Sequence, residues 1–419
     1  MPVDESDVVV IGAGAAGLSL AWRLVDRRAG EPAPVPSVTV VEPPPGPVRS
    51  PARTWCFWEE AGGEWDGMLA ASWRRMLVRG RDGASVGGPC PTPYKMLRSG
   101  DFTRAVEERL RPVPGVRMLT GTVTAVHDGP RGALAEGTDA DGRPFRLHGR
   151  WIFDSRPPRR LPPARTTLLQ HFRGWFVRTR ESCFDPAVAE LMDLRTPQPG
   201  RGVSFVYVLP FSTREALVEY TEFSAAPLNR DVYEAALRHY THVTRPLGTF
   251  TVTGTEQGVI PMTDGLFPRR TGARVFPLGA AAGATRPSTG YTFAALQRQT
   301  AHIASACRAG RTPLPPRPHA RRHRAMDAVL LRALAAGEVE GAAFFEDLFR
   351  RNPLPRVLRF LDGRSTPRDE WSLGVRTPVG AMLRSLAALP ALPRRTAAAP
   401  AAGGPPGPDR GSGQEAALR

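Results

Sequence analysis

The chain has 419 residues, of which 41% are hydrophobic and 23% are charged, so it has room for two or three folded domains and is not disordered throughout. Lys and Arg outnumber Asp and Glu by 56 to 40, a formal net charge of +16. This charge favours an anionic cofactor or a membrane surface over nucleic acid, because no basic run with interleaved aromatics resembles a nucleic-acid module.

The first predicted element is a buried strand at 8–11 that enters a glycine-rich turn and then a helix, in the stretch DVVVIGAGAAGLSLAWRL. The glycines permit a tight turn, a close approach of the backbone to a pyrophosphate, and close packing of helix on strand. A second strand at 37–42 ends in an acid suited to ribose hydroxyls. The pattern predicts dinucleotide binding by Gly12, Gly14, Ala15, Gly17 and Glu42. FAD and NAD(P) both fit, and the N-terminal position favours FAD as the tightly held cofactor.

The segment RTWCFWEE at 53–60 is unusually aromatic. Two interpretations of Trp55, Phe57 and Trp58 stay open. They are hydrophobic core beneath the cofactor domain, or they form an aromatic wall whose ring faces stabilise a cation beside the cofactor.

The middle of the chain, at 161–268, changes to strand-like segments separated by turns, which predicts an antiparallel sheet inserted between two parts of the cofactor domain. Strands at 203–209 and 216–221 are expected to form a hairpin. In the stretch LVEYTEFS, the two-residue period of a strand puts Glu219 on one face and Glu222 on the other. These two acids are therefore not expected to act as a pair.

The chain then returns to the cofactor domain through a strand at 275–278 and a glycine-rich turn, with a helix expected to start near Gly290. Backbone amides of this turn suit the carbonyl edge of a flavin or a pyrophosphate. The residues expected to contact the cofactor are Gly279, Gly283, Thr289 and Gly290. The alternative is a turn that only serves packing.

Beyond residue 310 the chain is helical and basic, and mixes aromatics with Arg. This region is either an amphipathic, membrane-facing surface or a helical cap on the substrate domain. The tail is of low complexity and is expected to be disordered. The predicted fold class is α/β. Its parts are a Rossmann-like FAD-binding domain at 1–160 and 269–310, an antiparallel-sheet substrate domain at 161–268, a helical C-terminal region at 311–395, and a disordered tail at 396–419.

Several motifs occur together in a specific order, and from residue 7 to about 386 the chain resembles the flavin-dependent lycopene cyclases of the bacterial and plant type. The motifs are DVVVIGAGAAGLSLA, RTWCFW, FDSRPP, QHFRGW, LVEYTEFS, GVIPM, LGAAAGATRPSTGYTF, FFEDLF and RFLDGRST. The resemblance implies a flavoprotein fold of the monooxygenase or hydroxylase type. It also implies an isomerase, a lycopene β-cyclase, that closes the ψ-ends of lycopene, via γ-carotene, into β-rings with no net redox change.

The resemblance places Glu219 on the acid of the family's LxE[DE]T pattern, which is taken as the proton donor. The next position, often acidic in the family, is Tyr220 here, and Arg53 stands where relatives commonly carry histidine. A buried glutamic acid has its pKa raised by desolvation, which suits proton donation to an alkene. The residues expected beside the substrate are Trp55, Phe57, Trp58 and Tyr220. Reduced FAD is the implied cofactor, with NAD(P)H only as the source of reduction.

The alternative function is an NAD(P)H-dependent FAD monooxygenase that acts with oxygen on a hydrophobic molecule. A flavin-dependent nucleic-acid binder is the third reading, and no nucleic-acid partner is expected. The expected partners are lycopene or another acyclic carotene, a membrane surface, and other enzymes of the carotenoid pathway. No secretory signal begins the chain and no apolar run reaches the roughly 20 residues that span a bilayer. The expected location is therefore cytoplasmic, peripheral to the inner face of the membrane. Four cysteines without Cys-x-x-Cys spacing predict no metal site.

Overall fold

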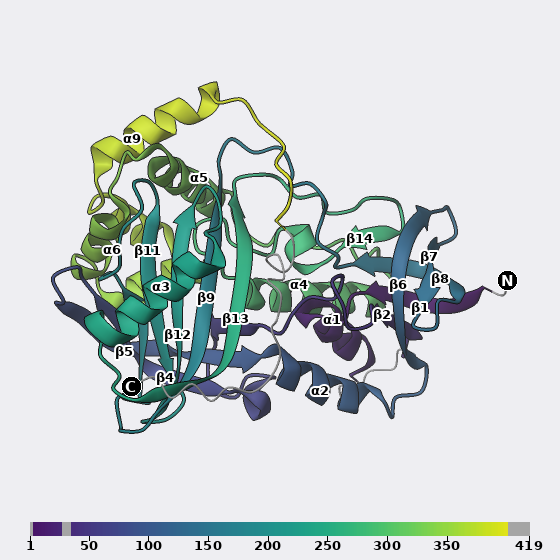
Figure 1. The fold of residues 1–419 in the computed structure, drawn as a ribbon. Coiled ribbons are helices and arrows are strands. Elements are labelled where there is room, and N and C mark those ends of the chain that lie inside the picture. The colour runs from purple at the N-terminus through teal and green to yellow at the C-terminus, as the bar shows by residue number, and fades with distance from the viewer. Residues whose placement is uncertain (1–2, 27–34, 401–419) are drawn as a thin grey trace.

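The computed structural model describes residues 3–26 and 35–400, which form two sheets covered by helices (Figure 1). The smaller sheet carries the predicted dinucleotide unit, and its parallel strands lie in the order β6–β2–β1–β8–β14, with β7 antiparallel to β6 and β8. Helices α1, α2 and α4 cover one face of this sheet with a shared apolar cluster. The elements are β1 (Asp4–Ile11), α1 (Ala15–Val25), β2 (Val38–Glu42), α2 (Ser99–Leu110), β6 (Val116–Asp128), β7 (Ala133–Asp139), β8 (Pro144–Asp154), β14 (Val275–Pro277) and α4 (Phe293–Arg308).

The larger sheet has the order β13–β9–β12–β11–β10–β4–β5–β3. Its strands are β3 (Thr54–Trp58), β4 (Ala71–Arg79), β5 (Ser85–Arg98), β9 (Thr167–Thr179), β10 (Val188–Asp193), β11 (Val203–Pro210), β12 (Glu215–Ser224) and β13 (Phe250–Thr263). The predicted hairpin of β11 and β12 is present. Strands β3 to β5 correct the predicted boundaries, because residues 54–98 were assigned to the cofactor domain and instead pair in this sheet. The joint between them and the rest of the sheet is the parallel pairing of β4 with β10, a contact between distant segments that local periodicity does not encode.

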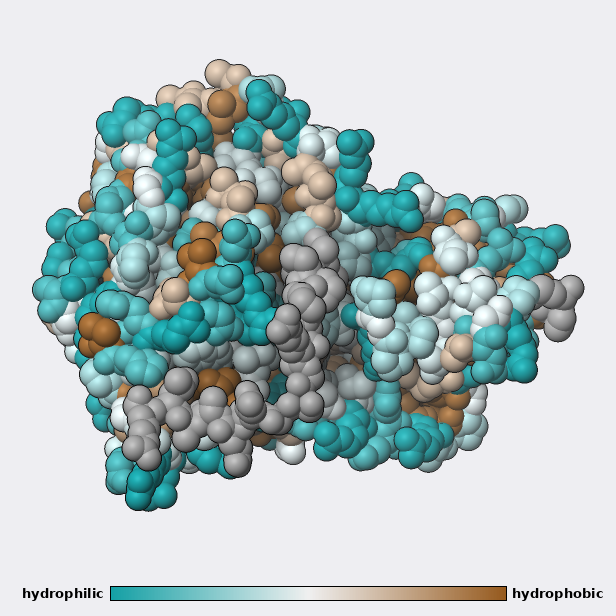
Figure 2. All heavy atoms as spheres, in the orientation of Figure 1, coloured by the Kyte–Doolittle hydropathy of each residue, from teal (hydrophilic) through white to brown (hydrophobic). Residues whose placement is uncertain are grey.

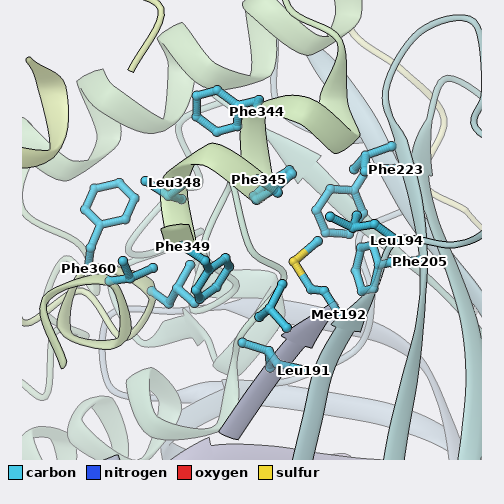
Figure 3. Close-up of a cluster of buried hydrophobic side chains, with 14 of the residues drawn as sticks. Leu191, Met192, Leu194, Phe205, Phe223, Phe344, Phe345, Leu348, Phe349 and Phe360 are labelled. Carbon is cyan, nitrogen blue, oxygen red and sulfur yellow. The ribbon is translucent and has the colours of Figure 1, made fainter. Parts of the chain in front are cut away.

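Helices cover both faces of the larger sheet. Helix α3 (Arg230–His239) packs on one face (Figure 1). The C-terminal region packs on the other, where Phe345 of α6 lies close to Phe223 of the sheet, and Phe223 in turn packs on Phe205 (Figure 3). Its helices are α5 (Arg321–Ala336), α6 (Gly341–Arg350), α7 (Leu354–Leu361), α8 (Pro367–Gly374) and α9 (Val379–Ala388). Within the described ranges, none of the helices is long and apolar enough to cross a bilayer.

The segment 396–400 was expected to begin a disordered tail, and this part of the prediction is wrong. Its backbone pairs with the loop that precedes β9: Leu161 N donates to Ala397 O at 2.9 Å, and Ala399 N donates to Arg159 O at 3.1 Å. Backbone pairing of this kind does not depend on side-chain composition, which was the basis of the prediction. The remainder of the predicted tail, 401–419, lies outside the described residues.

Candidate active site

The turn between β1 and α1 has the geometry of a dinucleotide cradle. Gly12 has a φ of +98°, and a Cβ on Gly17 would lie 1.9 Å from the carbonyl oxygen of Gly12, so neither position accepts another residue without strain. At Gly14, by contrast, a Cβ would meet nothing within 4 Å. Open space before the N-terminus of α1, which starts at Ala15, is where a pyrophosphate fits.

Glu42 lies at the end of β2, next to this turn, as predicted. Its Oε2 accepts a hydrogen bond from Ala13 N, and its Oε1 lies 3.5 Å from Arg49 Nε. Burial raises the pKa of the Glu42 carboxyl, and the bond from Ala13 opposes that rise. The carboxylate is therefore held beside the cradle, where ribose hydroxyls would reach it.

The turn after β14 packs against the cradle. Gly279 has a φ of +62°, and a Cβ there would lie 2.7 Å from Ala16 Cβ in the first turn of α1. Its amide donates to Gln299 Oε1 at 2.8 Å, and Gly283 ends the short helical turn at 279–282 with a φ of +77°. The two glycine-rich turns, far apart in sequence, thus meet at one helix N-terminus.

Thr289 and Gly290 lie elsewhere, against the larger sheet. A Cβ on Gly290 would lie 1.9 Å from Gln170 Oε1 on β9. The helix expected to start near Gly290 begins at Phe293, because the left-handed φ of +71° at Gly290 cannot continue into a helix. Among the described residues, Thr289 Oγ1, Gln170 Oε1 and Trp58 Nε1 are buried without hydrogen-bond partners. Such groups can bind a polar ligand.

The two acids of β12 face opposite sides of the sheet, as predicted. Glu222 accepts a hydrogen bond from the Tyr220 hydroxyl at 3.0 Å, on the face that α3 covers. Glu219 lies on the other face and accepts from Thr221 Oγ1 at 3.0 Å. The expectation that Tyr220 adjoins the substrate beside Glu219 is therefore corrected, since strand alternation turns its ring away from that acid.

Glu219 belongs to a row of residues that crosses four strands on one face. The pairing aligns Tyr207 with Glu219, Glu219 with Gly174, and Gly174 with Glu256. A Cβ on Gly174 would lie 2.8 Å from Leu217 Cδ1, 3.3 Å from Glu219 Cβ and 3.4 Å from Glu256 Cγ. The absence of a side chain at Gly174 lets two carboxyl groups meet across the strand that separates them.

Glu256 is a candidate functional residue that the sequence patterns did not indicate. It shares a side-chain hydrogen bond with Glu219 and accepts another from Thr54 Oγ1 at 2.7 Å. Thr54 lies on β3 and Glu256 on β13, the two edge strands, so the larger sheet curls around this site. The only sequence signal for Glu256 was an acid within a strand-like segment. Its contact with Glu219 depends on the register of β12 and β13 against β9, which the sequence does not show.

The environment places the shared proton on Glu219. Burial and the neighbouring Glu256 charge raise the Glu219 pKa well above its ordinary value. The Glu256 pKa is also raised by burial, but hydrogen bonds from Thr54 and Glu219 and the charges of Arg53 and Arg98 oppose that rise. Glu219 therefore holds a proton more tightly than Glu256, whose surroundings favour the charged form more. Arg53, which stands where relatives commonly carry histidine, is a cation that favours the charged form of Glu256.

The aromatic residues of β3 lie on two faces of the strand, one in the core of the cofactor domain and one facing the larger sheet's site. Trp55 and Phe57 stack on Phe293 of α4, with ring centroids 5.6 and 4.4 Å apart, and belong to the cofactor-domain core. Trp58 points the other way, 4.8 Å from Tyr94 and 4.7 Å from the ring of Tyr291. Alternation along β3 thus corrects the idea of a single three-ring wall, and only Trp58 lies on the side of the strand that also holds Thr54.

A tyrosine cluster connects Trp58 with the acid pair. The hydroxyls of Tyr94 and Tyr291 are 3.2 Å apart, and Tyr291 shares a second hydrogen bond with Tyr207, the neighbour of Glu219 in the row. Burial raises the pKa of each of these tyrosines, so all three stay neutral. A narrow crevice opens beside the cluster. Its lining combines Cys56, Phe57, Trp58 and Tyr291 with charged and aliphatic residues of α4, the 310–320 loop and the end of α7.

A family model described as lycopene cyclase protein matches residues 7–387. The chain belongs to the lycopene cyclase family. The resemblance seen in the motifs is thereby confirmed. Of the acid pair, Glu219 lies in the stretch that the family pattern marks, and Glu256 lies outside it on β13. A search of curated protein sequences found no match.

Solved structures with a similar fold are flavoproteins and related proteins of low sequence identity. A flavoprotein/dehydrogenase from Cytophaga hutchinsonii has a TM-score of 0.62 at 12% identity, over 92% of this chain and 99% of its own. The p-nitrophenol 4-monooxygenase PnpA from Pseudomonas putida has a TM-score of 0.59 at 16% identity, over 92% and 98%. A geranylgeranyl bacteriochlorophyll reductase-like protein from Thermoplasma acidophilum has a TM-score of 0.57 at 13% sequence identity, over 92% of this chain and 96% of its own. These likenesses confirm the predicted fold class.

Proposed function

We propose that this member of the lycopene cyclase family is a lycopene β-cyclase that requires reduced FAD. It converts the ψ-end groups of lycopene, via γ-carotene, into β-ionone rings with no net redox change. The observation that carries the proposal is the Glu219–Glu256 pair, two buried carboxyl groups that share a hydrogen bond, in which Glu219 has the more strongly raised pKa. Acyclic carotenes carry no polar group, and their reacting alkenes are very weak bases, so the reaction needs a desolvated proton donor of this kind.

The first chemical step is proton transfer from Glu219 to the terminal trisubstituted alkene. The proton forms a new C–H bond and leaves a tertiary cation, which the neighbouring double bond attacks to close the six-membered ring. Proton transfer leaves both Glu219 and Glu256 ionised, and two carboxylates in an apolar site stabilise a cation strongly. Loss of a ring proton to this pair forms the new double bond and restores the neutral Glu219. The product is therefore an isomer of the substrate, and the pair ends in its starting state.

The buried rings beside the acid pair suit a cationic intermediate. Trp58, Tyr94, Tyr207 and Tyr291 present π-faces or neutral hydroxyls, which attract a cation and offer no strong nucleophile to trap it. Cys56 is a competing nucleophile within electrostatic reach of Glu219 and Glu256, and burial raises the pKa of its thiol, so it stays protonated. The site therefore favours ring closure over capture of the cation by the protein.

The cofactor cradle fits FAD by its chemistry. The open space at Gly14 and the carboxylate of Glu42 suit a pyrophosphate and a ribose. The unpaired polar atoms at Thr289 and Gln170 suit the far end of the same cofactor. When bound and reduced, FAD would supply an electron-rich ring that stabilises positive charge, with NAD(P)H as the source of reduction. Gly12, Gly17 and Gly279 would hold the backbone close to it.

The experiment is expression of the full chain in cells that accumulate lycopene, with pigment analysis and measurement of oxygen uptake by the purified, reduced protein. The expected products have the same mass as lycopene, and no oxygen is consumed. A product heavier by one oxygen atom would instead establish the alternative, an NAD(P)H-dependent FAD monooxygenase. Unchanged lycopene under reducing conditions would refute the proposed substrate.

Gly174→Ala tests the contact between the two carboxyl groups. The added methyl would press on Leu217, Glu219 and Glu256, while the backbone there needs no left-handed φ. We expect cyclisation to fall by about tenfold or more, with a loss of stability of about 1–3 kcal/mol. Activity is measured by carotene conversion and stability by urea unfolding. Gly254→Ala on β13 is the matched control, since its Cβ would make only ordinary contacts with Phe176. Equal activity of both variants would contradict the role of Gly174.

A further inference from the structure

Helices α8 and α9 expose an unusual number of large apolar side chains. Trp371 is 75% exposed, and the other members are 46–58% exposed. We call this the C-terminal apolar surface and define it as Trp371, Val375, Val379, Leu383 and Leu386. Within α9, the last three recur at the spacing of a single helix face. Figure 2 shows hydrophobic residues at the upper end of the molecule, where Figure 1 places α9.

This surface is not the core-facing side of its helices. The inward side of α8 and α9 is formed by buried residues such as Leu373 and Ala381, which join the apolar cluster beneath the larger sheet. Helix α9 therefore has apolar residues on both its inner and its outer side, whereas a helix that faces water carries polar residues outside. Exposed apolar residues gathered on one face of a helix in this way mark an interaction site.

The charges around the surface are mainly cationic. Arg368, Arg376 and Arg384 are exposed on or between the same two helices, and Arg384 also pairs with Glu338, with Nε 2.8 Å from Oε2. The two acids of α8 turn inward, where Asp369 lies 2.7 Å from Arg359 and Glu370 lies 2.9 Å from Arg322. An apolar face with an exposed tryptophan and a rim of arginines complements the boundary between anionic headgroups and acyl chains.

We propose that the C-terminal apolar surface docks the protein on the surface of a membrane that contains anionic lipid. Trp371 and the aliphatic side chains enter the headgroup region, and the arginines contact lipid phosphates. The inner side of these helices joins the same apolar cluster that lies on the Glu219 face of the sheet, so docking sets the site beside the phase in which a carotene dissolves. Lipid binding itself does not require the cyclase assignment and is measured without substrate.

The test is flotation of the purified full chain with vesicles of phosphatidylcholine alone or mixed with phosphatidylglycerol. We expect the protein to float with the mixed vesicles, and raised salt to weaken binding through the arginines. The variant Trp371→Ser/Leu383→Ser should lower the partition coefficient by about tenfold or more. The matched control, Val232→Ser/Val243→Ser, removes equally exposed apolar side chains (49% and 65%) from the region of α3 and should bind as the unaltered protein does.

Three results would overturn the proposal. The protein could fail to float with mixed vesicles, or the Trp371→Ser/Leu383→Ser variant could float as well as the control. In the third, light scattering would show that the unaltered protein is a dimer and that this variant is a monomer with unchanged lipid binding. The last result would assign the surface to a second copy of the chain.

Discussion

Glu219→Gln should abolish ring closure, with a loss of about 10³-fold or more, because a general acid typically contributes 10²–10⁴-fold and an alkene accepts a proton from no weaker donor. Glutamine has the same shape and can still donate a hydrogen bond to Glu256, so the fold and cofactor binding should persist. The measurement is conversion of lycopene by the reduced protein. The matched control is Glu222→Gln, on the same strand and equally buried but on the opposite face, which should retain activity. Retained activity in Glu219→Gln would reject it as the acid.

The same variant makes a prediction for stability against pH. The raised Glu219 pKa means that the folded protein keeps a proton that the unfolded chain releases above about pH 4.3. The folded state of the unaltered protein therefore loses stability as pH rises from that value towards the raised pKa, by up to about 1.4 kcal/mol per pH unit. Glu219→Gln lacks this dependence. The free energy of unfolding of the variant, relative to that of the unaltered protein, should therefore increase with pH in denaturant unfolding between pH 5 and 9. Parallel curves would show that Glu219 is not protonated in the folded state.

The dinucleotide unit was predictable from sequence because its determinants are local. The positions of Gly12, Gly14 and Gly17 relative to β1 and α1, and Glu42 at the end of β2, follow from one strand, one turn and one helix. The separation of Glu219 from Glu222 was equally local, since a strand alternates its side chains whatever it pairs with.

The acid pair was not predictable in this way. Glu219 and Glu256 meet only because β9 lies between β12 and β13 in one register and carries a glycine at the crossing point. A shift of one residue in either pairing would turn the two acids to opposite faces. The separation of Trp55 and Phe57 from Trp58 has a related cause, because composition marks an aromatic strand but not which of its faces packs in the cofactor-domain core. Non-local register thus decides the parts of the site that the local patterns left open.

Gly14→Asp should give a folded protein that does not hold FAD. The position has a φ of −79° and open space for a side chain, and Asp is a favoured residue at the N-cap of a helix, so the apoprotein should be as stable as before or more stable. The added carboxylate would occupy the space of the pyrophosphate. Two unit charges at about 4 Å repel by about 4 kcal/mol at an effective dielectric constant of 20, which corresponds to roughly 10³-fold in Kd.

Titration of the apoprotein with FAD, followed by flavin fluorescence, measures this effect, and Gly14→Asn separates charge from bulk. Asparagine has nearly the same shape without the charge, so its Kd should lie between those of the unaltered protein and Gly14→Asp. Gly17→Ala should differ from both, because its Cβ would collide with the Gly12 carbonyl and deform the turn itself, which lowers stability in the absence of FAD as well. Unweakened binding by Gly14→Asp would mean that the pyrophosphate does not lie at this helix N-terminus, and the cofactor assignment would fail with it.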